Sequence, residues 1–164
     1  MLAHRRADVA DLNAHARVVL RDAGTLAGPD HRLETERGTQ DFAVGKGVMF
    51  LRNERGMGLR NGMLGTLARI EGVAAGGSDT RLVVRLDGKV AVLPGAEGRN
   101  VAFQLRDYRH LAPGCASTVH KAQRVTVDRA HVLATLGIDR HVAYVALNRH
   151  REGVTVHRSR EEHI

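Results

Sequence analysis

The sequence predicts an α/β fold in which a parallel-sheet domain, built from both ends of the chain, is interrupted by a small all-β unit. Three observations support this prediction. Helix and strand patterns occur near the start and again near the end, and short apolar runs separated by glycine-rich turns fill the middle. Strand, helix and strand in succession favour a parallel sheet, and 164 residues are enough to bury a core.

The N-terminal part is predicted to begin with a strand and a helix. Residues 1–4 are short and apolar enough for a strand. Residues 6–24 carry apolar side chains at helical spacing, namely Val9, Leu12, Ala16, Val19 and Leu20. Asp8 is suited to cap the start of this helix and Gly24 to end it. Residues 26–40 mix glycine, proline and charges without a period, which indicates a linker.

Residues 42–106 have the pattern of the all-β unit. Asp87-Gly88 separates two β-branched runs by two residues, which predicts a tight hairpin. Asn61-Gly62 and Gly76-Gly77 indicate further turns. The density of glycine between positions 45 and 77 favours a barrel of sharply bent strands.

The C-terminal part returns to the α/β pattern. We expect a short helix at 118–123, a strand at 130–136, a helix at about 140–149 and a strand at 153–157. Asp139 is placed to cap the second helix. The two chain ends are therefore predicted to form one domain.

The charge of the chain favours a polyanionic partner. The formal net charge is +7 and the pI about 10.6, and only three of the 25 basic residues are lysine. Aromatic residues make up 3% of the chain, so phosphate contacts are expected to outweigh base stacking if the partner is nucleic acid. An ordinary basic surface is the alternative.

Other classes of protein are disfavoured by composition. The single cysteine, Cys115, leaves no partner for an internal disulfide, and the ten histidines have no metal-ligand spacing, so no metal site is expected. No segment is apolar enough to span a membrane, and residues 1–13 lack the apolar region of a signal peptide. We therefore expect a soluble, cytoplasmic protein without a membrane partner.

The segment STVHKAQRVTVD, residues 117–128, is a candidate phosphate-binding site. Ser117 is placed to cap the helix that follows, where backbone N–H groups are unpaired. The Thr118 hydroxyl and the Lys121 ammonium would complete a phosphate cradle, and His120 and Gln123 lie close enough to contact a neighbouring phosphate or sugar. The alternative is a capped helix with a solvated lysine.

Arg149 has an unusual position in the second predicted helix. It falls on the same stripe as three apolar residues, Val142, Val145 and Ala146. One explanation is that Arg149 interacts with the negative end of the helix. The other is that it offers its guanidinium to an anion, as arginine fingers do.

The chain lacks the sequence elements of a complete nucleotide hydrolase. Gly45-Lys46-Gly47 is not a P-loop, because Gln40 and Gly47 occupy positions that require glycine and a hydroxyl residue. No nucleophile, base and acid grouping is found either. The isolated chain is therefore expected not to hydrolyse ATP.

Several of these segments resemble a known family. STVHKAQRVTVDRAHVL and YVALNRHREGVTVH resemble the fifth and sixth motifs of the RecD-like superfamily-one DNA helicases, in particular the helicase part of TraA-type conjugative relaxases. MLAHRRADVADLNAHAR is similar to their fourth motif, and FLRNERGMGLRNGMLGT to the start of their inserted barrel. The resemblance covers nearly the whole chain in the expected order.

The resemblance implies a fold and a set of partners. Residues 1–40 and 107–164 would be the second RecA-like domain of an ATP-dependent helicase used in conjugative plasmid transfer, and residues 41–106 an inserted SH3-like barrel. Single-stranded DNA and the first RecA-like domain of the same protein would be the partners. ATP and Mg²⁺ would bind the complete protein, with no cofactor expected on this chain alone.

The resemblance also implies site residues. Ser117, Thr118, His120, Lys121 and Gln123 would contact the DNA backbone. Arg149 would be the arginine finger that reaches the γ-phosphate of ATP, and Arg5 or Arg6, of which we select Arg6, would face the same nucleotide cleft.

The sequence departs from the family pattern at three places. Arg124 replaces a glycine, Asn148 replaces a threonine, and Gly45-Lys46-Gly47 replaces Gly-Asp-Arg. These departures are compatible with a second hypothesis, a noncatalytic protein-interaction module or degenerate helicase remnant. A third, a small RNA- or ribosome-associated barrel protein, has only charge and the β pattern in its support.

Overall fold

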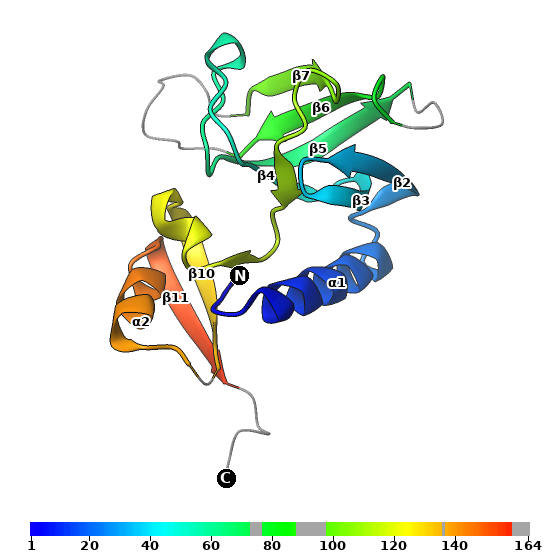
Figure 1. Ribbon diagram of the computed structural model, residues 1–164. Helices are drawn as coiled ribbons and strands as arrows, with labels where there is room; N and C mark the ends of the chain where they lie inside the picture. The colour runs from blue at the N-terminus through cyan, green and yellow to red at the C-terminus, as the bar shows by residue number, and fades with distance from the viewer. Residues whose placement is uncertain (73–76, 88–97, 136, 159–164) are drawn as a thin grey trace. The chain divides into compact units, whose positions relative to one another are not determined.

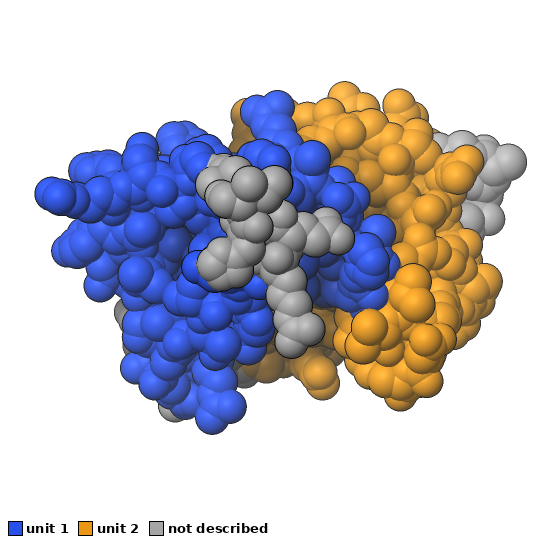
Figure 2. Space-filling model, turned by 90° about the horizontal axis from the view of Figure 1, so that it is seen from below, with its two compact units in different colours: residues 1–16, 115–164 blue, residues 17–114 orange. Residues whose placement is uncertain are grey.

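The computed structural model describes residues 1–72, 77–87, 98–135 and 137–158 of the chain. The chain folds into two compact units, which Figure 2 shows in different colours. We call residues 1–16 and 115–164 the α/β unit and residues 17–114 the β unit. The sequence predicts an all-β unit at residues 41–106, whereas the β unit of the structure extends over residues 17–114.

The α/β unit contains a parallel sheet, as predicted. Its four strands are arranged in the order β11-β10-β1-β9, and every strand pair in it is parallel. One helix follows β1 and a second connects β10 to β11, which makes a β-α-β unit (Figure 1). The elements are β1 (Leu2–Ala3), α1 (Arg6–Asp22), β9 (Ser117–Thr118), β10 (Val127–Ala134), α2 (Arg140–Leu147) and β11 (His150–Arg158). The last turns of α1, from Arg17 onward, belong to the β unit.

Helix α1 is confirmed, although its start differs from the prediction. The Asp8 carboxylate lies in the first turn and pairs with Arg5 at 2.9 Å, so Asp8 does not cap the helix. Gly24 ends the helix region as expected, with a φ of 71° and its N–H donated to the carbonyl of Arg21 at 3.0 Å. Val19, which was expected on the apolar stripe, is exposed.

The β unit consists of a two-stranded and a five-stranded antiparallel sheet. The larger sheet has the order β7-β6-β5-β4-β8, and β2 pairs with β3 in the smaller one. A short 3-10 helix, η1 (Arg55–Met57), interrupts the loop between β4 and β5. The strands are β2 (Ala27–Thr35), β3 (Gly38–Val44), β4 (Gly47–Phe50), β5 (Leu64–Glu71), β6 (Arg81–Leu86), β7 (Asn100–Gln104) and β8 (Leu111–Pro113).

The predicted linker at 26–40 is wrong, because this segment forms β2 and the start of β3. Leu33 and Thr35 are buried while their neighbours are exposed, which is the alternation of a strand with one covered face. The Thr35 hydroxyl donates to the carbonyl of Gly38 at 2.8 Å and closes the turn to β3. Charged residues on the exposed face concealed this alternation in the sequence.

The core of the β unit is built around three aromatic rings. Phe50, Phe103 and Tyr108 pack against one another with ring centroids 5.5 to 6.1 Å apart. Each side chain is less than a tenth exposed, and aliphatic residues from most strands of the unit surround them. Burial raises the pKa of the Tyr108 phenol, whose hydroxyl donates to the carbonyl of Arg52 at 2.7 Å.

Of the three predicted turns, one lies wholly within the described residues and is confirmed. Gly62 has a φ of 90°, and the N–H of Met63 donates to the carbonyl of Arg60 at 3.1 Å. The predicted hairpin at Asp87-Gly88 and the turn at Gly76-Gly77 lie partly outside the described residues. Within them, β6 pairs with β7.

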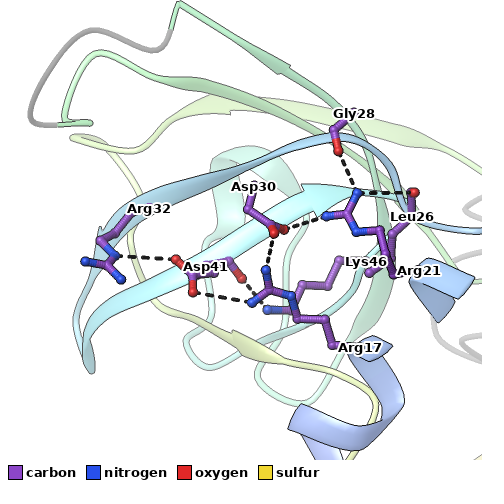
Figure 3. Close-up of polar contacts among 8 residues, drawn as sticks. All are labelled: Arg17, Arg21, Leu26, Gly28, Asp30, Arg32, Asp41 and Lys46. Carbon is purple, nitrogen blue, oxygen red and sulfur yellow. Dashed lines mark hydrogen bonds and ion pairs between the residues drawn. The ribbon is translucent and has the colours of Figure 1, made fainter. Parts of the chain in front are cut away.

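An ion-pair network joins the last turns of α1 to the β2–β3 hairpin within the β unit (Figure 3). Arg17 bridges Asp30 and Asp41, and Arg21 pairs with the second oxygen of Asp30 at 2.7 Å. The Lys46 ammonium donates to the Asp41 carbonyl and lies 4.9 Å from the centre of the Phe42 ring. Lys46 therefore contributes to packing in this unit.

No helix among the described residues is long and apolar enough to cross a membrane.

Candidate nucleic-acid interface

The candidate DNA-contact segment begins as a strand. Ser117 and Thr118 form β9, which pairs with Leu2 and Ala3 of β1, and both side chains are at most 9% exposed. The Ser117 hydroxyl donates to the carbonyl of Thr118 at 3.4 Å. The predicted cap at Ser117 is therefore wrong, because strand pairing holds this residue inside the sheet.

A single 3-10 turn replaces the predicted helix at 118–123. The turn, η2 (Lys121–Arg124), has no side-chain cap at its start. The Thr118 hydroxyl oxygen accepts the N–H of Lys121 at 3.4 Å, which orders the turn. With only four residues, η2 lacks the summed dipole on which the predicted anion site depended. We therefore expect phosphate contacts mainly from the exposed side chains of the turn.

Three predicted contact residues lie at the surface of this turn. His120, Lys121 and Gln123 are exposed, whereas Thr118 is buried beneath them. Ala122 and Val125 are buried and hold the turn against the unit. The turn thus exposes an ammonium, an imidazole and an amide, while its buried residues anchor its backbone. These groups can donate hydrogen bonds to the oxygens of a phosphate.

Helix α2 positions Arg149 one residue beyond its C-cap. Asp139 caps the start of the helix, as predicted, and accepts the N–H of Val142 at 2.8 Å. Ala146 is fully buried, and Asn148 donates its side-chain amide to the carbonyl of Tyr144 at 2.8 Å. Asn148, a departure from the family pattern, is therefore accommodated as a satisfied helix end.

The Arg149 guanidinium connects the end of α2 to the turn at η2. Its Nε donates to the carbonyl of Val145 at 3.1 Å, and its Nη1 donates to the carbonyl of Gln123 at 2.5 Å. Two candidate residues 26 positions apart in the chain are thus in direct contact. The side chain is half-buried, so part of the guanidinium faces solvent.

Arg6 and Arg149 lie at opposite ends of the parallel sheet. Ala3, three residues before Arg6, pairs with Leu133 near the end of β10. The N–H of Val127, the first residue of β10, donates to the carbonyl of Arg149 at 3.0 Å. The six-residue offset along β10 corresponds to about 20 Å. The structure of the α/β unit therefore does not bring the two predicted nucleotide-binding residues together.

The contact between Gln123 and Arg149 is a feature that sequence reasoning missed. It depends on the parallel pairing of β10 with β11, in which Val127 is level with His150. No local pattern encodes that register. Among the described residues, no group of three or more histidine, cysteine, aspartate or glutamate side chains is arranged to hold a metal ion.

The cap of α2 predicts a pH dependence of stability. The hydrogen bond from Val142 is the main cause that lowers the pKa of Asp139 below its ordinary value. A lowered acid pKa stabilises the fold above the unfolded pKa of about 3.9, and this stabilisation is lost as the pH falls through the folded pKa. The stability advantage of the wild type over Asp139→Asn should therefore shrink below about pH 3.9. Urea unfolding between pH 2 and 7 would measure it, and a constant difference over that range would contradict the assignment.

The fold of the chain is similar to part of the Pif1 helicases of known structure. Unliganded Pif1 from Bacteroides sp. matches with a TM-score of 0.63 and 22% identity, over 94% of this chain and 39% of that one. Pif1 helicase from Candida albicans matches with a TM-score of 0.63 and 20% identity, over 94% of this chain and 44% of that one. The chain therefore has the fold of one portion of a helicase of this class.

The sequence is similar to one segment of the conjugal transfer proteins named TraA. The protein from Rhizobium radiobacter is 41% identical over 157 residues, and a probable TraA from Sinorhizobium fredii is 38% identical over the same length. These alignments include 96% of this chain but only 13% of each relative. No protein-family model matches the chain. The chain is a homologue of this segment of TraA, which confirms the resemblance seen in its motifs.

Proposed function

We propose that this chain is the DNA-contacting portion of a conjugative helicase-relaxase. It would act as a second RecA-like domain that carries an SH3-like barrel insertion. His120, Lys121 and Gln123 would contact the single-strand backbone, while the buried Ser117 and Thr118 hold the turn in place. The similarity to TraA and the Pif1 structure described as bound to ssDNA support this proposal.

One observation carries the proposal, the hydrogen bond from Arg149 to the carbonyl of Gln123. In a helicase, the affinity for DNA must change with the state of the bound nucleotide. Here the candidate arginine finger holds the backbone of the candidate DNA-contact turn. A shift of the Arg149 guanidinium toward a phosphate would therefore break or move this hydrogen bond and so change the position of the turn.

Arg149 has hydrogen-bonding capacity left for a phosphate. A guanidinium has five N–H donors, and in the described structure two of them are used, one on Nε and one on Nη1. ATP and Mg²⁺ would be held by the first RecA-like domain elsewhere in the longer protein. One Pif1 helicase has been crystallised with ADP-AlF4, which mimics a nucleotide during phosphoryl transfer. The role of this chain would be to stabilise the charge on the transferred phosphoryl group.

Binding of a fluorescent single-stranded oligonucleotide at several salt concentrations tests the DNA contact. Lys121→Ala should weaken binding and lower the slope of log K against log salt by about 0.7, the value for one lost phosphate contact on a single strand. Arg129→Ala is the control, because it removes one charge from the same unit at an exposed ion pair with Glu152. Equal effects of both variants, or binding that does not depend on salt, would refute the assignment of the turn.

A further inference from the structure

The loop between β4 and β5 carries an unusual concentration of arginine. Residues 51–62 read LRNERGMGLRNG and contain three arginines, Arg52, Arg55 and Arg60, all of which are exposed. Arg99, the residue immediately before β7, contacts the same loop: its guanidinium donates to the carbonyl of Met57 at 2.8 Å. Glu54 is the single acidic residue of the loop.

The loop projects from the five-stranded sheet (Figure 1). Its conformation is held by hydrogen bonds within the loop and at its base. Glu54 and Leu59 exchange two backbone hydrogen bonds of 2.9 Å, and Leu59 is buried in the core of the unit. The side-chain oxygen of Asn53 accepts the N–H of Asn61 at 2.8 Å. At the base, the Tyr108 hydroxyl holds the carbonyl of Arg52. The loop backbone that carries the arginines is therefore ordered by hydrogen bonds.

The arginines of this loop differ from most others in the β unit. The side chains of six arginines elsewhere in the unit form ion pairs with aspartate or glutamate: Arg17, Arg21, Arg32, Arg69, Arg81 and Arg106. In the part of the chain that the structure describes, Arg55, Arg60 and Arg99 have no such partner within 4.0 Å. The Glu54 carboxylate instead accepts the N–H of Gly56 at 3.1 Å. Among the described residues, these three guanidinium groups are therefore not paired with a carboxylate.

We propose that Arg55, Arg60 and Arg99 form a second DNA contact, which binds the phosphodiester backbone through the β unit. A guanidinium presents a planar pair of donors that matches two oxygens of a phosphate. The loop contains no aromatic residue, so bases cannot stack on aromatic side chains there, and phosphate contacts should make binding largely independent of sequence. The inference rests on the proposed DNA function, but it assigns that function to residues outside the turn at η2.

The experiment uses the 164-residue chain with the double variant Arg55→Gln/Arg60→Gln. Affinity for a single-stranded oligonucleotide and for a duplex is measured from low to moderate salt. The salt slope should fall by about 1.4 for the single strand and about 1.8 for the duplex, the values for two lost contacts. The form of DNA, single-stranded or duplex, for which the double variant loses more affinity is the form that the loop binds.

Two further variants make the result specific. Arg69→Gln/Arg81→Gln removes the same charge from the same unit, but both of these arginines already face Glu71 and should change the slope little. Arg55→Lys/Arg60→Lys keeps the charge and should retain the salt slope while weakening affinity, because lysine cannot bind a phosphate bidentately. Circular dichroism of each variant verifies that the fold is intact.

The outcomes separate this inference from the proposed function. If the loop and control variants weaken binding equally, or if the loop variant binds DNA like the wild type, the loop inference is overturned. The proposed function survives that result provided that Lys121→Ala still weakens binding. If the chain binds neither form of DNA at low salt, both proposals fail.

Discussion

Arg149→Ala, introduced into a full-length protein that contains this chain, is expected to lower DNA-stimulated ATP hydrolysis by about a thousandfold or more. Arginine fingers contribute about 10³ to 10⁵ in turnover, because they stabilise charge on the transferred phosphoryl group. Arg149 is suited to this role by its remaining N–H donors and by its contact with the turn at η2. Phosphate release at saturating DNA and ATP measures the effect.

The contact of Arg149 with Gln123 requires a control that separates two roles. A purely structural arginine would be needed only to hold the turn, and its loss would weaken DNA binding without reducing turnover at saturating DNA. A finger would reduce turnover even when DNA is saturating. Arg129→Ala, an exposed arginine of β10 paired with Glu152, should leave turnover unchanged. Turnover of Arg149→Ala within tenfold of the wild type would exclude the finger role.

Much of the α/β unit could be predicted from the sequence because its signals are local. The cap at Asp139 and the apolar spacing that follows predict α2, and the observed helix is close to the expected one. The glycine at position 24 marks the end of α1 in the same way. These features depend on residues within one or two helical turns of each other, so a single sequence contains them.

The features that the sequence did not predict depend on tertiary contacts. The sequence of β2 has the composition of a linker, because charged residues such as Asp30 are typical of solvent-exposed loops. In the structure Asp30 pairs with Arg17 and Arg21 of α1, and this network satisfies the charges along the strand (Figure 3). A charge with a distant partner cannot be distinguished in the sequence from a charge in water.

The candidate site shows the same division. Lys121 and Arg149 were each identified from local patterns, but their placement near one turn depends on the strand register of β10 and β11. The register also places Arg6 and Arg149 near different ends of β10, whereas the family resemblance implies that both face one nucleotide cleft. The substitution at Asn148 suggested degeneration, yet its side chain completes a helix end. Substitutions relative to a family pattern therefore have to be judged by their contacts.

Gly45→Ala is expected to destabilise the β unit by at least about 4 kcal/mol, in the range reserved for steric or strained core changes. Gly45 has a φ of 91°, and a Cβ at this position would overlap the carbonyl oxygen of Thr25. The backbone cannot easily move away. The N–H of Gly45 donates to the carbonyl of Leu67 at 2.8 Å, and the N–H of Leu67 donates to the carbonyl of Lys46 at 2.9 Å.

Gly38→Ala provides a matched comparison for this effect. Gly38 has nearly the same φ, 90°, but a Cβ there would meet no atom within 4 Å. Its replacement should cost only the backbone strain of about 1–2 kcal/mol. The difference between the two variants in the free energy of unfolding, measured by urea denaturation, thus isolates the clash with Thr25. Equal destabilisation would mean that the β3–β4 corner can relax, and that the close approach of Gly45 to Thr25 does not hold this part of the unit together.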